Sequence, residues 1–161
     1  MGTHNIWDET IMNAVRAIHA KSKRENDAPD SICDIKDVIY EMRLIKDSHE
    51  LNIMRRAAEI SSNAHKRAML YVRPGLYEYQ VEAEILHEFN KHGCQAPAYT
   101  SVVASGKNSC ILHYIENNDQ LKNGELLLID AGCELESYAS DITRTFPIGK
   151  HYSPPQKDIY E

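Results

Sequence analysis

The chain has 161 residues, enough for one domain or for one domain with part of another. Its formal net charge is −6, which disfavours a nucleic-acid-binding role because such domains are usually basic. No apolar run approaches the roughly 20 residues of a membrane span, and the start of the chain lacks the basic and apolar segments of a secretory signal peptide.

Residues 8–20 place Ile11, Met12, Val15 and Ile18 on one face of a predicted helix. The polar run that follows, residues 21–31, contains Ala-Pro-Asp-Ser and is typical of a linker or long loop. A stretch of about 30 residues cannot bury a core of its own. We therefore expect residues 1–35 to be the tail of one domain plus a linker, and residues 36–161 to belong to a second domain.

Two helices are predicted next. Asp47 and Glu50 form a capping-box pattern that begins a long helix, and the Arg-Pro-Gly sequence at 73–75 ends it. A second helix covers about residues 77–92 and ends at Gly93. The residues predicted to face inward are Leu51, Met54, Ala58, Ser61, Ala64 or His65, Ala68, Val81, Ile85 and Phe89. The other histidines on helices are expected at the surface.

The second part of the chain is richer in β-branched residues and turn signals. We predict a β-hairpin over residues 98–115, a second hairpin over 126–146, and a helix that begins at Ser153 before Pro154. This order predicts an α+β fold in which two helices pack on antiparallel strands. Because the sequence ends about one turn into the last helix, we expect it to be a fragment.

Four cysteines, Cys33, Cys94, Cys110 and Cys133, are widely spaced and form no C-x-x-C pair. We expect them to be buried free thiols in a reducing compartment, which favours a cytoplasmic location.

Two aspartates in the second hairpin carry the main chemical signal. A turn centred between Leu135 and Glu136 would place Asp130 and Asp141 directly opposite each other, with their Cβ atoms about 5 Å apart. At an effective dielectric near 20, the two charges would repel by roughly 3 kcal/mol. A bound divalent cation would relieve this repulsion, and carboxylates suit Mn, Mg, Co or Zn. Thr143 and Thr145 on the same face could orient the carboxylates.

Spacing alone favours a simpler alternative, in which Asp130 caps a turn and Asp141 is a solvated surface residue. The surrounding residues reverse that preference. The sequences I-D-A-G (129–132) and D-I-T-R-T-F-P (141–147), with C-I-L-H-Y (110–114) upstream, resemble the pita-bread metallopeptidases, and among them the Xaa-Pro aminopeptidases (aminopeptidase P). The resemblance covers about residues 38–161.

The resemblance implies the first half of a pita-bread catalytic domain, with residues 1–35 at the end of a smaller N-terminal domain. It implies that Asp130 and Asp141 bind two divalent metal ions, most often Mn, with Co or Zn as alternatives. It implies that His113 lies in the substrate pocket and helps to stabilise the reacting amide, and that Tyr99 and Arg144 support the site. The remaining ligands of the family, a His and two Glu, come from the second half of the fold, so this fragment alone is expected to be inactive.

The implied reaction is hydrolysis of the bond between an N-terminal residue and a following proline, with peptides as substrates. A prolidase-type dipeptidase and a non-catalytic pita-bread module that binds proteins remain alternatives. The intact aspartate pair argues against chemistry like that of creatinase, which has the same fold and needs no metal. An isolated half of the fold would expose an apolar face, so a homo-oligomer is expected.

Overall fold

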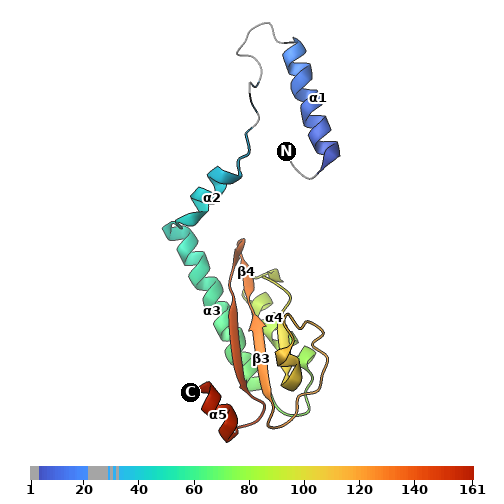
Figure 1. Ribbon diagram of the computed structural model, residues 1–161. Helices are drawn as coiled ribbons and strands as arrows, with labels where there is room; N and C mark the ends of the chain where they lie inside the picture. Colours follow the sequence, from blue (N-terminus) through green and yellow to red (C-terminus); the bar gives the residue numbers. More distant parts are fainter. Residues whose placement is uncertain (1–3, 22–28, 30, 32) are drawn as a thin grey trace. The chain divides into compact units, whose positions relative to one another are not determined.

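The computed structural model describes residues 4–21, 29, 31 and 33–161 (Figure 1). Its contacts divide the chain into two units, Met1–Lys46 and Asp47–Glu161. Most of the predicted linker at 21–31 lies outside the described residues. The assignment of residues 1–35 to a separate N-terminal domain therefore stays a prediction.

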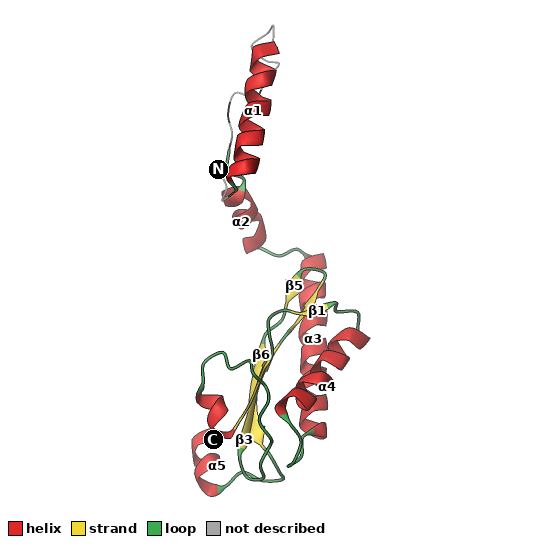
Figure 2. Ribbon diagram, turned by 90° about the vertical axis from the view of Figure 1, so that its right-hand side faces the viewer, coloured by secondary structure: helices red, strands yellow, loops and turns green. Residues whose placement is uncertain are grey.

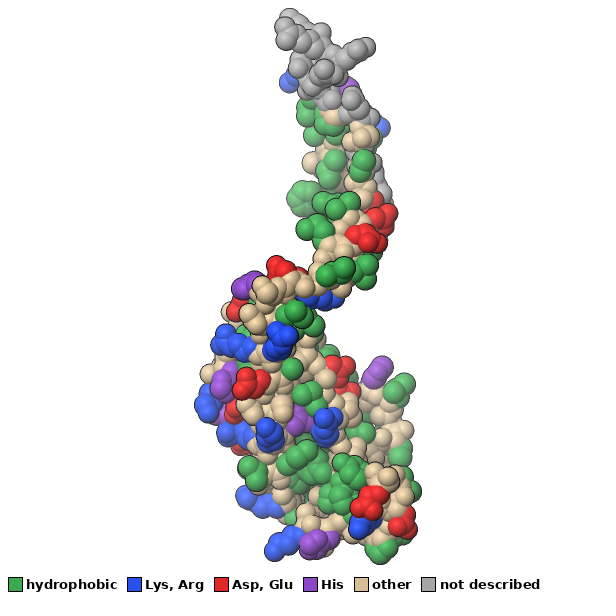
Figure 3. Space-filling view, turned by 90° about the vertical axis from the view of Figure 1, so that its left-hand side faces the viewer, with side chains coloured by type: hydrophobic (Ala, Val, Ile, Leu, Met, Phe, Trp, Pro, Cys, Tyr) green, Lys and Arg blue, Asp and Glu red, His purple; other side chains and the backbone are tan. Residues whose placement is uncertain are grey.

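The described part of the first unit contains two helices, α1 (Asn5–Lys21) and α2 (Lys36–Leu44), and neither has a buried residue. The helix predicted over 8–20 is confirmed by α1, whereas α2 was not predicted. Figure 3 shows apolar side chains in green on the surface of this unit. The large ones that are exposed are Ile6, Trp7, Ile11, Ile18, Ile35, Val38, Ile39, Tyr40, Met42, Leu44 and Ile45.

The second unit begins with α3 (Ser48–Tyr71) and α4 (Glu78–Lys91), as predicted. The Asp47 side chain accepts hydrogen bonds from the backbone N–H groups of His49 and Glu50, and the Glu50 carboxylate accepts one from the Asp47 N–H. This reciprocal capping box satisfies amide groups that the first helical turn leaves free. Although α3 has 24 residues, no helix within the described ranges is both long enough and apolar enough to cross a membrane.

The inward face of α3 differs from the predicted one in its first half. Its buried residues are Ile53, Ala57, Ile60, Ser61, Ala64, His65 and Ala68. Leu51 and Ala58, which were predicted to face inward, are exposed. In this first half, the predicted and the observed inward positions are both spaced by three or four residues, so periodicity alone does not distinguish them. His65 is only 3% exposed, with Nδ1 2.9 Å from the Ser61 carbonyl oxygen, which shows that a histidine of this helix belongs to the core.

Two antiparallel three-stranded sheets complete the unit. Strand β3 (Leu126–Ala131) lies between β2 (Val102–Ser105) and β6 (Ile142–Pro147), and β4 (Cys133–Leu135) lies between β1 (Ala96–Pro97) and β5 (Tyr138–Ala139). Helices α3 and α4 cover one face of the strands, and α5 (Pro154–Tyr160) follows β6 (Figures 1 and 2). Leu127, Ile129 and Ala131 point toward the helices and join their core. The predicted α+β class, the antiparallel strands and the helix start at Ser153 are confirmed.

The predicted hairpin over residues 98–115 is wrong in its second arm. After β2 the chain forms a short 3₁₀ helix, η2 (Gly106–Cys110), and then an irregular segment, and β2 pairs with β3 instead. Buried polar side chains hold the segment in place of a strand ladder. The Asn117 side chain accepts from the Val103 N–H at 2.9 Å and donates to the Ser101 carbonyl oxygen at 2.9 Å.

The second hairpin exists, but its register differs from the prediction. Its turn is formed by Glu136 and Ser137, whose φ angles are 50° and 69°, so both lie in the left-handed region. Asp130 therefore pairs with Thr143 rather than with Asp141. A shift of two residues leaves every side chain on its predicted face, because side chains alternate along a strand.

The cysteines were only partly anticipated. All four are free, but Cys94 and Cys133 are buried whereas Cys33 and Cys110 are exposed. Burial, followed by the neighbouring Cys133 thiol, raises the pKa of Cys94 to about 12, so this thiol is unreactive at neutral pH.

Candidate active site

The two aspartates converge on a single hydroxyl group. Asp130 lies near the end of β3, and Asp141 immediately precedes β6. The Tyr99 hydroxyl lies 2.6 Å from Asp130 Oδ1 and 3.0 Å from Asp141 Oδ1 and can donate to either carboxylate. The two carboxylates therefore point to the same side of the sheet, as expected, although they are not directly opposite each other.

Tyr99 moderates the repulsion between these carboxylates. Burial raises the pKa of Tyr99, and the hydrogen bonds to Asp130 and Asp141 raise it further, because each stabilises the neutral phenol against the anion. The hydroxyl thus remains a donor at neutral pH. Asp130 is half-buried while Asp141 is exposed, so one carboxylate is fixed within the sheet and the other is open to solvent.

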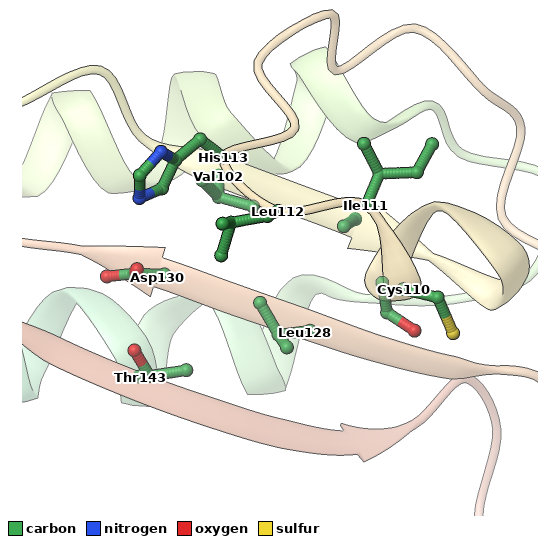
Figure 4. A pocket seen from close by; sticks show the side chains of 10 residues that line it. Val102, Cys110, Ile111, Leu112, His113, Leu128, Asp130 and Thr143 are labelled. Carbon is green, nitrogen blue, oxygen red and sulfur yellow. The ribbon is translucent and has the colours of Figure 1, made fainter.

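A cavity of about 300 Å³ adjoins Asp130 on the side of the sheet that faces away from α3 and α4. Figure 4 shows its wall: His113 and Leu112 from the irregular segment lie over the strands that carry Asp130 and Thr143. The residues that line the cavity are Val102, Ala104, Ser109, Cys110, Ile111, Leu112, His113, Leu128, Asp130 and Thr143. An apolar cavity with a few polar groups at one end is typical of a site for a small ligand or a peptide.

His113 occupies an unusual backbone conformation. Its φ angle is 54°, in the left-handed region that non-glycine residues rarely adopt, and its side chain is exposed at the cavity. His113 lies outside all strands, although the predicted hairpin over residues 98–115 would have placed it in one. The structure brings His113 and Asp130 to one cavity, and Asp141 is joined to Asp130 through Tyr99.

Residues 52–161 match metallopeptidase family M24. The chain belongs to this family. It is 45% identical to the Xaa-Pro aminopeptidase of Escherichia coli strain K12. The alignment of 160 residues covers 99% of the chain and 36% of that enzyme. The chain is 36% identical over 168 residues to human Xaa-Pro aminopeptidase 3, covering 99% of the chain and 32% of that protein.

Solved structures agree with this membership. Aminopeptidase PepP from Pseudomonas aeruginosa superposes with a TM-score of 0.91 at 47% identity, covering 99% of the chain and 36% of that protein. Proline aminopeptidase P II from Yersinia pestis gives a TM-score of 0.89 at 46% identity, covering 99% of the chain and 37% of that protein. The predicted resemblance and the pita-bread fold are confirmed. The M24 chain thus spans about a third of the length of the relatives it matches.

Membership of family M24 implies divalent metal ions, and the convergent carboxylates fit part of such a site. Carboxylate oxygens are hard ligands, and one oxygen of Asp130 on β3 and one of Asp141 directly before β6 lie within hydrogen-bond distance of the Tyr99 hydroxyl. Among the described residues, no group of three or more His, Cys, Asp or Glu side chains is arranged to hold a metal ion. Asp130 and Asp141 are a pair of carboxylates that would need further ligands to complete such a site.

The two residues predicted to support the site on β6, Thr143 and Arg144, differ in their surroundings. Thr143 pairs with Asp130 and lines the cavity, whereas Arg144 is exposed and donates to the Thr143 carbonyl oxygen at 2.7 Å. Sequence reasoning missed the apolar cavity residues Ile111 and Leu112, because the segment that holds them was taken for a strand. It also gave no sign that Glu78 is buried, because in sequence this residue looks like any acidic residue in the first turn of a helix.

Proposed function

We propose that the protein to which this M24 chain belongs hydrolyses the peptide bond between an N-terminal residue and a following proline. The observation that supports the proposal most directly is the pair of carboxylates that share the Tyr99 hydroxyl beside a cavity bearing His113. Its substrates are peptides with proline at the second position. Its cofactors are two divalent metal ions, Mn in preference to Co or Zn.

Each site residue has a separate role in this proposal. Asp130 and Asp141 hold the metal ions, and Tyr99 orients both carboxylates through its hydroxyl. When bound, the divalent ions supply Lewis acidity that allows water to attack an amide at neutral pH. His113 faces the same cavity and donates a hydrogen bond to the carbonyl oxygen of the scissile bond as negative charge develops on it.

Proline at the second position is compatible with this cavity. The bond before proline is a tertiary amide and offers no N–H to a binding site. Most of the cavity lining is apolar, from Val102, Ala104, Leu112 and Leu128 among others, so it suits a ring that brings no donor.

The activity requires residues beyond these 161. The family resemblance assigns a further His and two Glu to the metal site, and two carboxylates alone bind divalent ions weakly. We therefore expect the isolated chain to be inactive. We also expect a cytoplasmic protein that forms homo-oligomers.

The proposal is tested on the complete gene product with added Mn²⁺. A tripeptide with proline in the second position should be hydrolysed, and the matching peptide with alanine in that position should not. Asp130→Asn and Asp141→Asn should each lower kcat by more than about 100-fold, since loss of a ligand exceeds loss of a supporting residue. Glu134→Gln, at an exposed acidic residue of the same hairpin, is the matched control and should retain wild-type activity.

The same experiment separates the alternatives. Cleavage of Xaa-Pro dipeptides in preference to longer peptides would indicate a prolidase-type dipeptidase. Absence of hydrolysis under all metal conditions, in a folded protein, would reject the enzyme and leave the protein-binding module.

A further inference from the structure

Glu78 is completely buried at the start of α4. None of the groups that donate a hydrogen bond to its carboxylate belongs to a basic side chain. Its carboxylate accepts five hydrogen bonds, all from neutral amide or hydroxyl groups. Oε1 accepts from the Ser105 N–H (2.7 Å), the Ser105 hydroxyl (2.7 Å) and Asn108 Nδ2 (3.2 Å), and Oε2 accepts from the Tyr114 hydroxyl (2.8 Å) and the Asp119 N–H (3.0 Å). Burial of a carboxylate is tolerated only when such bonds compensate for lost hydration.

The five donors are spread along one segment of chain. They begin at the last residue of β2, continue through η2, and end at Asp119, which also accepts a hydrogen bond from the Glu78 N–H at 3.1 Å. One side chain therefore ties together the two ends and the middle of residues 105–119. Residues 106–119 have no strand ladder, so these bonds replace the backbone pairing that fixes a strand.

The cavity residues 109–113 lie between two of these anchors, Asn108 and Tyr114. His113 is the immediate neighbour of Tyr114 and has a left-handed backbone, which costs about 1 kcal/mol or more for a non-glycine residue. Such a conformation persists when its surroundings hold it. The Tyr114 ring is itself fixed, since it is only 6% exposed and its hydroxyl donates to Glu78.

We propose that Glu78 is a positioning residue of the active site: it fixes the segment 108–114 so that His113 faces Asp130 across the cavity. Glu78 does not line the cavity, so it acts through the segment and not on a substrate. The proposal rests on the proposed function, which gives His113 its role in hydrolysis.

The decisive variant is Glu78→Gln in the complete gene product. Glutamine keeps the shape of the side chain but replaces one acceptor oxygen with a donor, so hydrogen bonds to either Ser105 and Asn108 or Tyr114 and Asp119 are lost. We expect kcat to fall on the order of 10-fold to 100-fold, as for a misplaced catalytic group, with a smaller change in KM. Hydrogen exchange of the backbone amides of 106–119 should accelerate, while exchange in α3 and β3 stays as in the wild type.

Two control variants on the same helix separate positioning from a general loss of stability. Glu84→Gln removes a partly exposed carboxylate that pairs with Arg67 at 2.6 Å, and Val81→Ala creates a small cavity in the core without removing any of the five bonds. Both should keep the wild-type kcat per folded molecule. If Glu78→Gln fails to fold, Tyr114→Phe removes one of the five bonds and should lower kcat and accelerate the same amides to a lesser degree.

A double variant tests whether Glu78 acts through His113. Glu78→Gln combined with His113→Ala should be no slower than His113→Ala alone, whereas independent effects would multiply. Multiplying effects, or a wild-type kcat in Glu78→Gln, would overturn the proposal. If the wild type hydrolyses no peptide, the proposed function fails, and hydrogen exchange then decides this inference: unchanged exchange over 106–119 in Glu78→Gln would reject it.

Discussion

The two walls of the cavity are built in different ways. Asp130 belongs to a regular antiparallel ladder, paired with Val102 on one side and Thr143 on the other. His113, on the opposite wall, belongs to an irregular segment that buried side chains hold, chiefly those of Glu78 and Asn117. Backbone hydrogen bonds position the first wall, formed by β2, β3 and β6, which we call the strand wall. Side-chain hydrogen bonds position the second, formed by residues 106–119, which we call the segment wall.

This difference determines how each wall responds to mutation. Any residue except proline can contribute to a backbone ladder, so the strand wall should tolerate most substitutions that respect its two faces. A side-chain anchor depends on the identity of one residue, and its loss leaves several buried groups without partners. The strand wall should therefore fail through steric clashes, and the segment wall through missing hydrogen bonds.

The largest effect is expected at Gly132, which directly follows β3 and lies against the backbone of Ser140. A Cβ atom at this position would lie 1.7 Å from the Ser140 carbonyl oxygen, a backbone atom that cannot move without separating the strands beside Asp130 and Asp141. We expect Gly132→Ala to lower the free energy of unfolding by about 3 kcal/mol or more, measured by urea denaturation.

Gly75→Ala provides the comparison for this variant. A Cβ at Gly75 meets no atom within 4 Å, but the φ angle of 92° strains any residue other than glycine. This variant should lose only about 1 kcal/mol, which measures backbone strain without a clash. Equal losses in the two variants would show that the strand wall is not limited by packing.

A smaller effect is expected when an anchor of the segment wall is removed. Asn117→Ala leaves the buried Val103 N–H and the Ser101 carbonyl oxygen without their partner, and it places alanine at a φ angle of 45°. We expect a loss of about 2 to 3 kcal/mol in the free energy of unfolding.

Asn117→Gly separates the two causes, because glycine relieves the backbone strain and still loses the hydrogen bonds. Glu116→Ala, at an exposed neighbour, is the matched control and should change stability by less than about 0.5 kcal/mol. Wild-type stability in Asn117→Ala would show that side-chain anchors do not hold this wall.

The sequence predicts the strand wall better than the segment wall, because the strand wall depends on local backbone pairing and the segment wall on side chains that are distant in sequence. Alternating β-branched residues and capping residues are local signals, and they located α3, α4, β3 and β6. The predicted register was wrong by two residues because Glu136 and Ser137 form a turn with two positive φ angles without the Asn-Gly sequence that usually marks one. Asp130 and Asp141 nevertheless point to the same side of the sheet as predicted, because a shift of two residues preserves the alternation of side chains along a strand.

The segment wall depends on contacts that are distant in sequence. Glu78 is 27 residues from Ser105 and 36 from Tyr114, and no periodicity links them. The pattern Val-Val-Ala-Ser followed by Ile-Leu-His-Tyr-Ile is equally consistent with a hairpin. Only the three-dimensional structure shows that Asn108, Tyr114 and Asn117 turn inward and prevent that pairing.

The smallest effect concerns Tyr114, whose hydroxyl links the segment wall to Glu78. Burial and then the hydrogen bond to Glu78 raise the pKa of Tyr114 from 10.0 to about 12. Between these pH values the folded protein keeps a proton that the unfolded chain has lost, so this tyrosine's contribution to stability declines as pH rises, by at most about 1.4 kcal/mol per pH unit. Tyr114→Phe should lower the free energy of unfolding by about 1 to 2 kcal/mol at pH 8, since the hydroxyl no longer donates to Glu78 or accepts from Asn108. The difference from the wild type should then narrow as the pH is raised through 10 to 12 in urea titrations.

Tyr79→Phe, at a tyrosine that is 51% exposed, controls for removal of a phenol. A difference that stays constant over this range would mean that Tyr114 titrates alike in both states and that its bond to Glu78 does not stabilise the segment wall.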